Sequence, residues 1–193
     1  MVTADVIPET DILTQWYVVP AGTHESAIDE DKGSPNTGDY IRCGIGDNNL
    51  TDSFHMDDTI QDCDEYTQVK AYIYYNNIES PLGTPRQINI YVNGAWQAPQ
   101  NIPPQAIAWR NFTWAGLSGN QASLDDLRVK VVTGTMADDK FIPDEIRIYT
   151  MYAEVTYSVV VVGYAHKFLG IPSAKIGKVC GIPTANIANI KGV

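Results

Sequence analysis

The chain has 193 residues, enough for a domain with a substantial core, because about 150 residues bury roughly 70% of their unfolded surface. Its 13 Lys and Arg against 23 Asp and Glu give a net charge of −10. This excess of acid argues against a nucleic-acid partner, which needs a cationic stripe. The longest apolar run, residues 159–162, is far shorter than the ~20 residues of a membrane span, so we expect no membrane insertion. Met1 to Asp5 lack the basic and apolar regions of a cleavable signal peptide, so we expect none.

Residues 1–158 consist of short β-forming segments separated by Gly, Pro, Asn and Asp, a pattern typical of β-sandwiches and barrels. Helical periodicity is nearly absent, so we predict an all-β fold. The segment from residue 159 to 193 differs in character, and we treat it as a separate tail. The predicted strands are residues 16–19, 26–29, 40–44, 53–56, 68–75, 87–92, 107–114, 128–133 and 145–157.

Several predicted strands alternate apolar and polar residues with a period of two, which places alternate side chains on opposite faces of a sheet. Asn93-Gly94 predicts a tight type I′ hairpin turn, because that turn needs positive φ at both central residues. Ser123 is placed to cap a single helical turn over residues 124–127. The apolar faces that we expect to meet in the core are Val69, Ala71, Ile73 and Tyr75 in one strand and Ile88, Ile90 and Val92 in another.

Short motifs follow one another through the body in a recognisable order. They are Trp16 followed by Gly22, Ala27-Ile28-Asp29-Glu30, Asp39-Tyr40-Ile41, Cys43-Gly44-Ile45, Tyr72-Ile73-Tyr74, an aromatic strand near Trp109 and Trp114, and a closing strand from Arg147 to Val155. This order resembles a jelly-roll module of tailed-phage and environmental viral proteins, over about residues 4–157. The resemblance implies a two-sheet antiparallel jelly-roll sandwich over residues 1–158, of the same general shape as carbohydrate-binding modules. It does not by itself imply sugar binding, since unrelated functions share this fold.

The tail contains an 11-residue repeat, marked by Gly170, Gly181 and Gly192. Each unit has Pro near its start and Gly after its end, which predicts short helices of one to two turns. Its apolar residues form a stripe too small to bury itself, and we expect it to anchor the chain to a neighbouring subunit or a particle. The alternative is that the tail folds back on its own body. Tails with such units resemble C-terminal segments of virion-associated proteins. The anchor candidates are Ile171, Ile176, Val179, Ile182, Ile187, Ile190 and Val193.

We find no sequence motif for catalysis, and we expect a protein that is not an enzyme and binds no cofactor. His24, His55 and His166 lie in unrelated contexts, and the nucleophile-elbow and phosphate-loop motifs are missing. The densest carboxylate cluster is a weak candidate for a structural calcium ion, but a solvated loop is favoured because the cluster lacks the glycine of an EF-hand. These carboxylates are Asp57, Asp58, Asp62 and Asp64.

The three cysteines, Cys43, Cys63 and Cys180, are too few and too widely spaced for a disulfide framework. We favour buried or free thiols, although a bridge between Cys43 and Cys63 remains open.

Aromatic residues are the best candidates for a ligand surface, because aromatic platforms stack on sugar rings and anchor protein interfaces. The platform candidates are Tyr72, Tyr74, Tyr91 and Trp96, with the alternative that they fill the sandwich. Our first hypothesis is a viral structural protein at the virion surface: a capsid-decoration, head-fibre or tail-associated subunit whose partners are itself and other particle proteins. The alternatives are an extracellular carbohydrate-binding adhesin module, with a glycan as partner, and a subunit of an extracellular filament.

Overall fold

The structure, a computed structural model, describes residues 1–30, 32–137, 144–159, 178–179 and 182–183. The chain divides into two units, Met1–Ser158, called the body below, and Val159–Val193, called the tail. Within the described residues, no helix is long and apolar enough to cross a membrane. The elements are β1 (Val2–Val6), β2 (Pro8–Leu13), β3 (Tyr17–Val19), η1 (Glu25–Ala27), β4 (Tyr40–Gly44), β5 (Thr51–Met56), β6 (Cys63–Ile78), β7 (Arg86–Val92), β8 (Ala95–Trp96), β9 (Gln100–Ile102), β10 (Gln105–Ala115), α1 (Gln121–Leu124), β11 (Arg128–Val132), β12 (Glu145–Val159), β13 (Lys178–Val179) and β14 (Ile182–Pro183).

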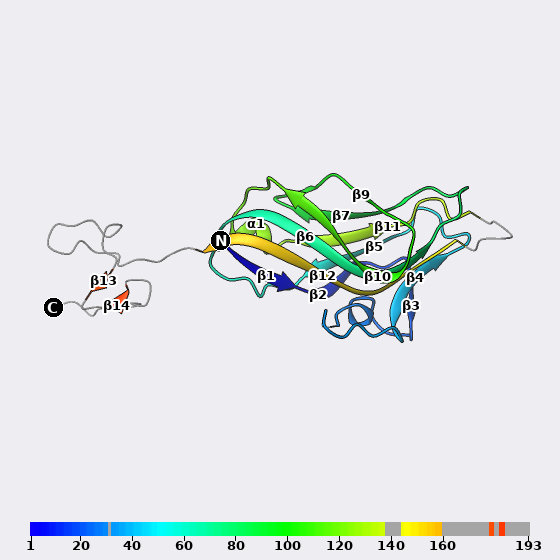
Figure 1. Cartoon of the computed structure of the whole chain (residues 1–193), viewed down its shortest axis with the longest axis horizontal. Helices are drawn as coiled ribbons and strands as arrows, with labels where there is room; N and C mark the ends of the chain where they lie inside the picture. Colours follow the sequence, from blue (N-terminus) through cyan, green and yellow to red (C-terminus); the bar gives the residue numbers. More distant parts are fainter. Residues whose placement is uncertain (31, 138–143, 160–177, 180–181, 184–193) are drawn as a thin grey trace. The chain divides into compact units, whose positions relative to one another are not determined.

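The body is a sandwich of two six-stranded sheets (Figure 1). Sheet A has the order β10-β6-β12-β4-β3, with β1 also paired to β12, and sheet B has the order β2-β5-β11-β7-β8, with β9 also paired to β7. From β4 to β7, and again from β10 to β12, each successive strand lies in the opposite sheet, so the chain crosses the sandwich at each connection. This alternation defines a jelly roll, and the predicted all-β, two-sheet antiparallel fold is confirmed.

The core lies between the inner faces of the two sheets. Val69, Ala71, Ile73 and Tyr75 of β6 are fully buried there. From sheet B, Ile88, Ile90 and Val92 of β7 are buried to the same degree. The period-two prediction for both strands is confirmed, because in each strand every second side chain reaches the core.

Two local predictions are resolved by the turn geometry. Asn93 and Gly94 have φ values of 55° and 74°, and Val92 pairs with Ala95 across them, so the two-residue hairpin is confirmed.

The predicted helical turn is displaced. Helix α1 starts earlier, because the Asn120 side chain accepts a hydrogen bond from the Ser123 N–H at 3.4 Å and the Asn120 N–H donates to Ser123 Oγ at 3.0 Å. Ser123 therefore completes the cap from inside the helix.

Other predictions of strands were wrong or incomplete. Residues 26–29 were predicted as a strand, but residues 25–27 form η1, because the Asp11 carboxylate accepts hydrogen bonds from the His24 and Glu25 N–H groups, both at 2.9 Å. Strands β1, β2 and β9 were missed. Strand β1 does alternate, with Val2, Ala4 and Val6 on one face, but it is short and only its last residue is buried, whereas β2 shows no apolar alternation.

Beyond Val159, which ends β12, four tail residues are described, and they form short strands where helical turns were expected. Lys178 pairs with Pro183 and Val179 with Ile182 in an antiparallel arrangement. Of the predicted anchor residues, Val179 and Ile182 therefore lie on β13 and β14. Docking of the tail stays a prediction, since the other anchor candidates lie outside the described residues: Ile171, Ile176, Ile187, Ile190 and Val193.

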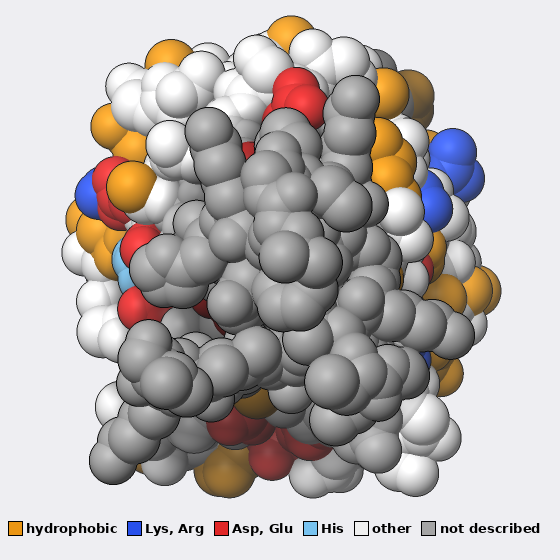
Figure 2. Space-filling model, turned by 90° about the vertical axis from the view of Figure 1, so that its left-hand side faces the viewer, with side chains coloured by type: hydrophobic (Ala, Val, Ile, Leu, Met, Phe, Trp, Pro, Cys, Tyr) orange, Lys and Arg blue, Asp and Glu red, His pale blue; other side chains and the backbone are white. Residues whose placement is uncertain are grey.

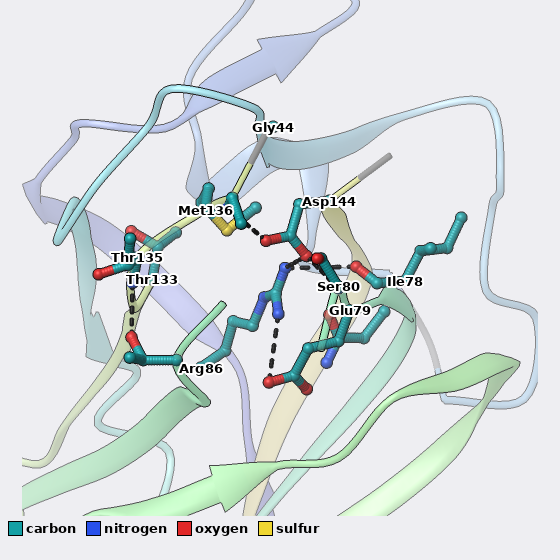
Figure 3. A network of polar contacts seen from close by, with 12 residues as sticks. Gly44, Ile78, Glu79, Ser80, Arg86, Thr133, Thr135, Met136 and Asp144 are labelled. Atoms are coloured by element: carbon teal, nitrogen blue, oxygen red, sulfur yellow. Dashed lines mark hydrogen bonds and ion pairs between the residues drawn. The ribbon is translucent and has the colours of Figure 1, made fainter. Parts of the chain in front are cut away.

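A buried ion-pair network fixes the start of β12 to the connection between β6 and β7 (Figure 3). Arg86, at the first position of β7, is fully buried and places Nη2 2.5 Å from Asp144 Oδ1. The same guanidinium donates to the Ile78 carbonyl at 3.2 Å and lies 3.4 Å from Glu79 Oε1. Asp144 also accepts the Ser80 N–H at 2.8 Å, so its carboxylate is needed by both the cation and the backbone.

We predict that Asp144→Ala destabilises the body by about 3 kcal/mol, because it leaves the buried Arg86 charge with only the more distant Glu79 carboxylate and leaves the Ser80 N–H without its acceptor. Urea unfolding followed by fluorescence measures this loss. Asp126→Ala is the matched control, since it removes an exposed partner of Arg128 and should cost less than about 1 kcal/mol. Equal losses for the two variants would contradict a stabilising role for the buried network.

Candidate functional site

The outer face of sheet A carries a layer of aromatic side chains from four neighbouring strands. Along β6, Tyr72 and Tyr74 alternate with the core residues and therefore point away from the core. On the neighbouring strand β10, Trp109 pairs in register with Tyr74 and faces the same side. We call the following set the aromatic layer: Tyr40 of β4, Tyr72 and Tyr74 of β6, Trp109 of β10, and Tyr149 and Tyr152 of β12.

The rings of the aromatic layer touch one another in an unbroken series. Tyr72 and Tyr152 stack with an interplanar angle of 5°, whereas the other pairs meet edge-on or tilted, the geometries that aromatic pairs prefer. Tyr149 is buried by its neighbours, and the other five rings are partly exposed. The centroid distances are 5.5 Å for Tyr40–Tyr149, 6.0 Å for Tyr149–Tyr74, 5.2 Å for Tyr74–Trp109, 5.5 Å for Trp109–Tyr152 and 4.6 Å for Tyr152–Tyr72.

A change of phase along β12 brings two tyrosines to this face. Ile146 and Ile148 point into the core, and the next residues of β12 in the core are Met151 and Ala153. The alternation therefore shifts by one position between Ile148 and Met151. An extra residue of this kind is how a β-bulge redirects side chains. As a result, both Tyr149 and Tyr152 contact rings of the aromatic layer.

A short segment, Ile28–Glu30, closes a gap beside this part of β12. Strand β4 pairs with β12 through Ile148, and β1 starts to pair with it at Ala153. Between them, the Ile28 carbonyl accepts the Met151 N–H at 2.8 Å and Thr150 Oγ1 donates to Glu30 Oε2 at 2.9 Å. This bridging segment therefore borders the aromatic layer.

A small cavity lies next to Tyr152 at this border. Its volume is about 110 Å³, and it is lined by Asp5, Ile7, Glu30, Lys32 and Tyr152. Lys32 Nζ lies 5.3 Å from the centre of the Tyr152 ring and forms an ion pair with Asp5. The cavity thus joins one end of the aromatic layer to groups that can donate and accept hydrogen bonds.

Burial controls the protonation of the groups around this cavity. It raises the pKa of Tyr152 to about 12 and also raises the pKa of Tyr149, so both hydroxyls remain protonated donors at neutral pH. Burial, reinforced by the neighbouring Asp39, raises the pKa of Glu30 to about 7. Glu30 Oε1 and Asp39 Oδ1 are both buried without a hydrogen-bond partner, and burial without a partner disfavours the ionised form of Glu30.

The four predicted platform residues do not form a single surface. Tyr72 and Tyr74 belong to the aromatic layer on sheet A, whereas Tyr91 and Trp96 lie on sheet B with their ring centres 5.4 Å apart. On sheet B, cations cover both rings: Lys130 Nζ lies 3.9 Å from the centre of Trp96, and the Arg128 guanidinium 4.8 Å from that of Tyr91. In the sequence all four sit in similar strands, and nothing marks which sheet each strand joins.

The acidic candidates Asp57, Asp58, Asp62 and Asp64 are not brought together as a metal site. Asp57 accepts the Thr59 hydroxyl at 3.2 Å, and the Asp58 carbonyl accepts the Gln61 amide at 2.8 Å. In the described ranges, no three His, Cys, Asp or Glu side chains are placed to hold a metal ion.

Cys43 and Cys63 are buried free thiols, as favoured from the sequence. Burial raises the pKa of each thiol. Both thiols therefore stay protonated at neutral pH, and Cys180 lies outside the described residues.

The visible charges of the described residues are mixed in sign. In Figure 2, Lys and Arg side chains lie singly among acidic and apolar ones around the rim of the view. On the outer face of sheet A, cations and carboxylates likewise alternate, as in the pairs of Lys70 with Glu154 and of Arg147 with Glu145.

Comparison with known proteins gives similarity of fold. No family model matches the chain, and no curated protein matches it either. Among solved structures, a CBM36-1 domain of a multidomain xylanase from the hindgut metagenome of Trinervitermes trinervoides aligns with 82% of this chain and 99% of its own, at 12% identity and a TM-score of 0.41. The infectious bursal disease virus Gt strain structure aligns with 89% of this chain and 35% of its own, at 6% identity and a TM-score of 0.34. At these values the likeness concerns the β-sandwich alone.

We predict that the contribution of Glu30 to the stability of the body falls as pH rises from about 4.5 to about 7, because folded Glu30 holds its proton more tightly than the unfolded chain does. Below this window both states are protonated, and above it both are ionised. Glu30→Gln should therefore gain roughly 1 kcal/mol relative to the natural chain between about pH 5 and pH 8, a modest value because the carboxyl is partly solvated. Urea unfolding at both pH values measures it, with the exposed Glu65→Gln as control. An unchanged difference between the two chains would show that Glu30 titrates normally.

Proposed function

We propose that the protein is a non-enzymatic binding module that holds a carbohydrate chain against the aromatic layer of sheet A. The observation that carries the proposal is the unbroken series of six rings, contributed by four adjacent strands, on the face that points away from the core. A face that needs only to meet water would be polar along an antiparallel sheet. Here, large rings occupy positions where they add nothing to the core between the sheets.

The layer offers the two kinds of contact that a sugar chain needs. The rings present apolar surface with hydroxyl groups attached, so that one side chain can both pack and hydrogen-bond. On β10, Asn111 and Thr113 lie on the same face as Trp109. They pair with β6 residues, Asn111 with Tyr72 and Thr113 with Lys70. Because the rings are spread over β4, β12, β6 and β10, a bound chain would run across the strands.

We predict that Trp109→Ala weakens carbohydrate binding by about tenfold or more, or ~1.4 kcal/mol, because it removes a central ring of the layer. A glycan array would identify ligands, and affinity electrophoresis would measure binding to them.

The matched control is Trp96→Ala, which removes a tryptophan ring from sheet B. The affinity of this variant for carbohydrate should stay within about twofold of that of the natural chain, since residue 96 is distant from a ligand on sheet A. Thermal unfolding of both variants checks that the body is intact. A loss of binding in the Trp96 variant alone would place the ligand on sheet B and refute the proposal.

A second candidate function is assembly as a viral structural subunit, which is supported by the 11-residue repeat of the tail. The body has a net negative charge, whereas residues 159–193 contain Lys167, Lys175, Lys178 and Lys191 and no acidic residue. Opposite charges on the two units favour docking of the tail on the body of another copy or on a particle protein. Such a subunit would act at the virion surface or as an extracellular filament, and it could still present the aromatic layer to a glycan.

We predict that a chain ending at residue 163 remains folded and soluble but no longer assembles or attaches, because the body is a unit by itself. Light scattering and negative-stain imaging of the full and shortened chains measure this. Normal assembly by the shortened chain would eliminate the tail as the anchor.

A further inference from the structure

The charged side chains that border the aromatic layer are already paired with one another. Lys70 Nζ lies 2.8 Å from Glu154 Oε1, and Arg147 Nη2 lies 2.8 Å from Glu145 Oε2. The Arg42 guanidinium lies 3.5 Å from the same Glu145 carboxylate. At the cavity beside Tyr152, Lys32 is paired with Asp5.

An anionic sugar would gain little from these cations. To bind one, its carboxylate would have to replace Glu154, Glu145 or Asp5, and the displaced protein carboxylate would stay nearby as a like charge. Arg110 on β10 does not change this balance, because it pairs in register with the core residue Ile73 and so lies on the opposite side of the strand from Trp109. The net charge of −10 adds a longer-range repulsion.

The groups that remain for ligand recognition are uncharged. The partly exposed Tyr152 borders the cavity, and its hydroxyl stays protonated at neutral pH, since burial raises its pKa to about 12. Asn111 faces the same side as Tyr72, and its amide can both donate and accept. Neutral donors and acceptors beside apolar rings match sugar hydroxyls and ring faces rather than ionised groups.

We infer that the ligand of the aromatic layer is an uncharged polysaccharide, and that the paired carboxylates around the layer select against uronate-bearing and sulfated chains. This inference rests on the proposed function and specifies its ligand class. The face selects by repelling the wrong ligand as well as by contacting the right one.

Polysaccharides that share a backbone and differ in charge provide the test. Three pairs are suitable: hydroxyethyl cellulose with carboxymethyl cellulose, fully methyl-esterified pectin with pectate, and arabinoxylan with glucuronoxylan. In affinity electrophoresis with the full chain, at least one neutral member should bind at least about tenfold more tightly than its anionic partner. Its affinity should change less than about twofold between low and high salt, since no net charge attracts it.

A charge variant then tests the cause of the selection. Glu154→Gln frees Lys70 from its partner, and the ratio of anionic to neutral binding should rise at least about threefold. Glu9→Gln is the matched control, because it removes one negative charge from an exposed position on β2 of sheet B. In that variant the ratio should stay within about twofold of the natural value.

The possible failures are distinguishable. Equal or tighter binding of the anionic members overturns the inference about ligand class and leaves the binding module in place. A ratio that rises equally in both variants overturns local selection by the paired carboxylates, because net charge alone then explains it. A lack of binding to either member of all three pairs, together with an empty glycan array, overturns the proposed function itself.

Discussion

The period-two geometry of two adjacent strands, β6 and β12, determines both the core and the candidate site. In β6, Ala71 and Ile73 point into the sandwich, so Tyr72 and Tyr74 must point out of it. The core and the aromatic layer are therefore two faces of one sheet, held at a fixed spacing by the backbone hydrogen bonds. A one-residue change of register in β6 would exchange the two faces and destroy both.

Strand β12 lies in the middle of sheet A and holds the other strands of that sheet together. It is hydrogen-bonded to β6 on one side and, on the other, to β4, the bridging segment and β1 in succession. The phase shift at residues 149–150 needs hydrogen-bond partners outside the regular strand pairing, since an unpaired residue in a sheet exposes backbone groups that must bond elsewhere. The Ile28 carbonyl accepts the Met151 N–H and so meets that requirement for one backbone group, and the bond from the Thr150 hydroxyl to Glu30 also holds the bridging segment at the edge of the aromatic layer.

Sequence reasoning could predict the elements whose signals are local. The alternation of Val69 to Tyr75 and the Asn93-Gly94 turn depend on neighbouring residues, and both were predicted correctly. Strand β2 was missed because Pro8 to Leu13 show no apolar period, whereas β1 was missed although Val2, Ala4 and Val6 alternate, since so short a strand gives a weak signal. The split of Tyr72 and Tyr74 from Tyr91 and Trp96 was missed for a different reason: which sheet a strand joins depends on contacts far away in the chain. Tyr149 and Tyr152 could not be assigned to one face, since a regular strand puts residues three apart on opposite faces.

The pairing of the first strand with the last one of the body has a consequence for how the protein is made. Val2 pairs with Tyr157, and β12 also separates β4 from β6 in sheet A. During synthesis, neither sheet A nor the core beneath it can close until nearly the whole body has been translated. Strands β6 and β10 can pair before β12 is made. Sheet A nevertheless stays divided until β12 is available, and its closure waits on contacts between distant residues, which form slowly.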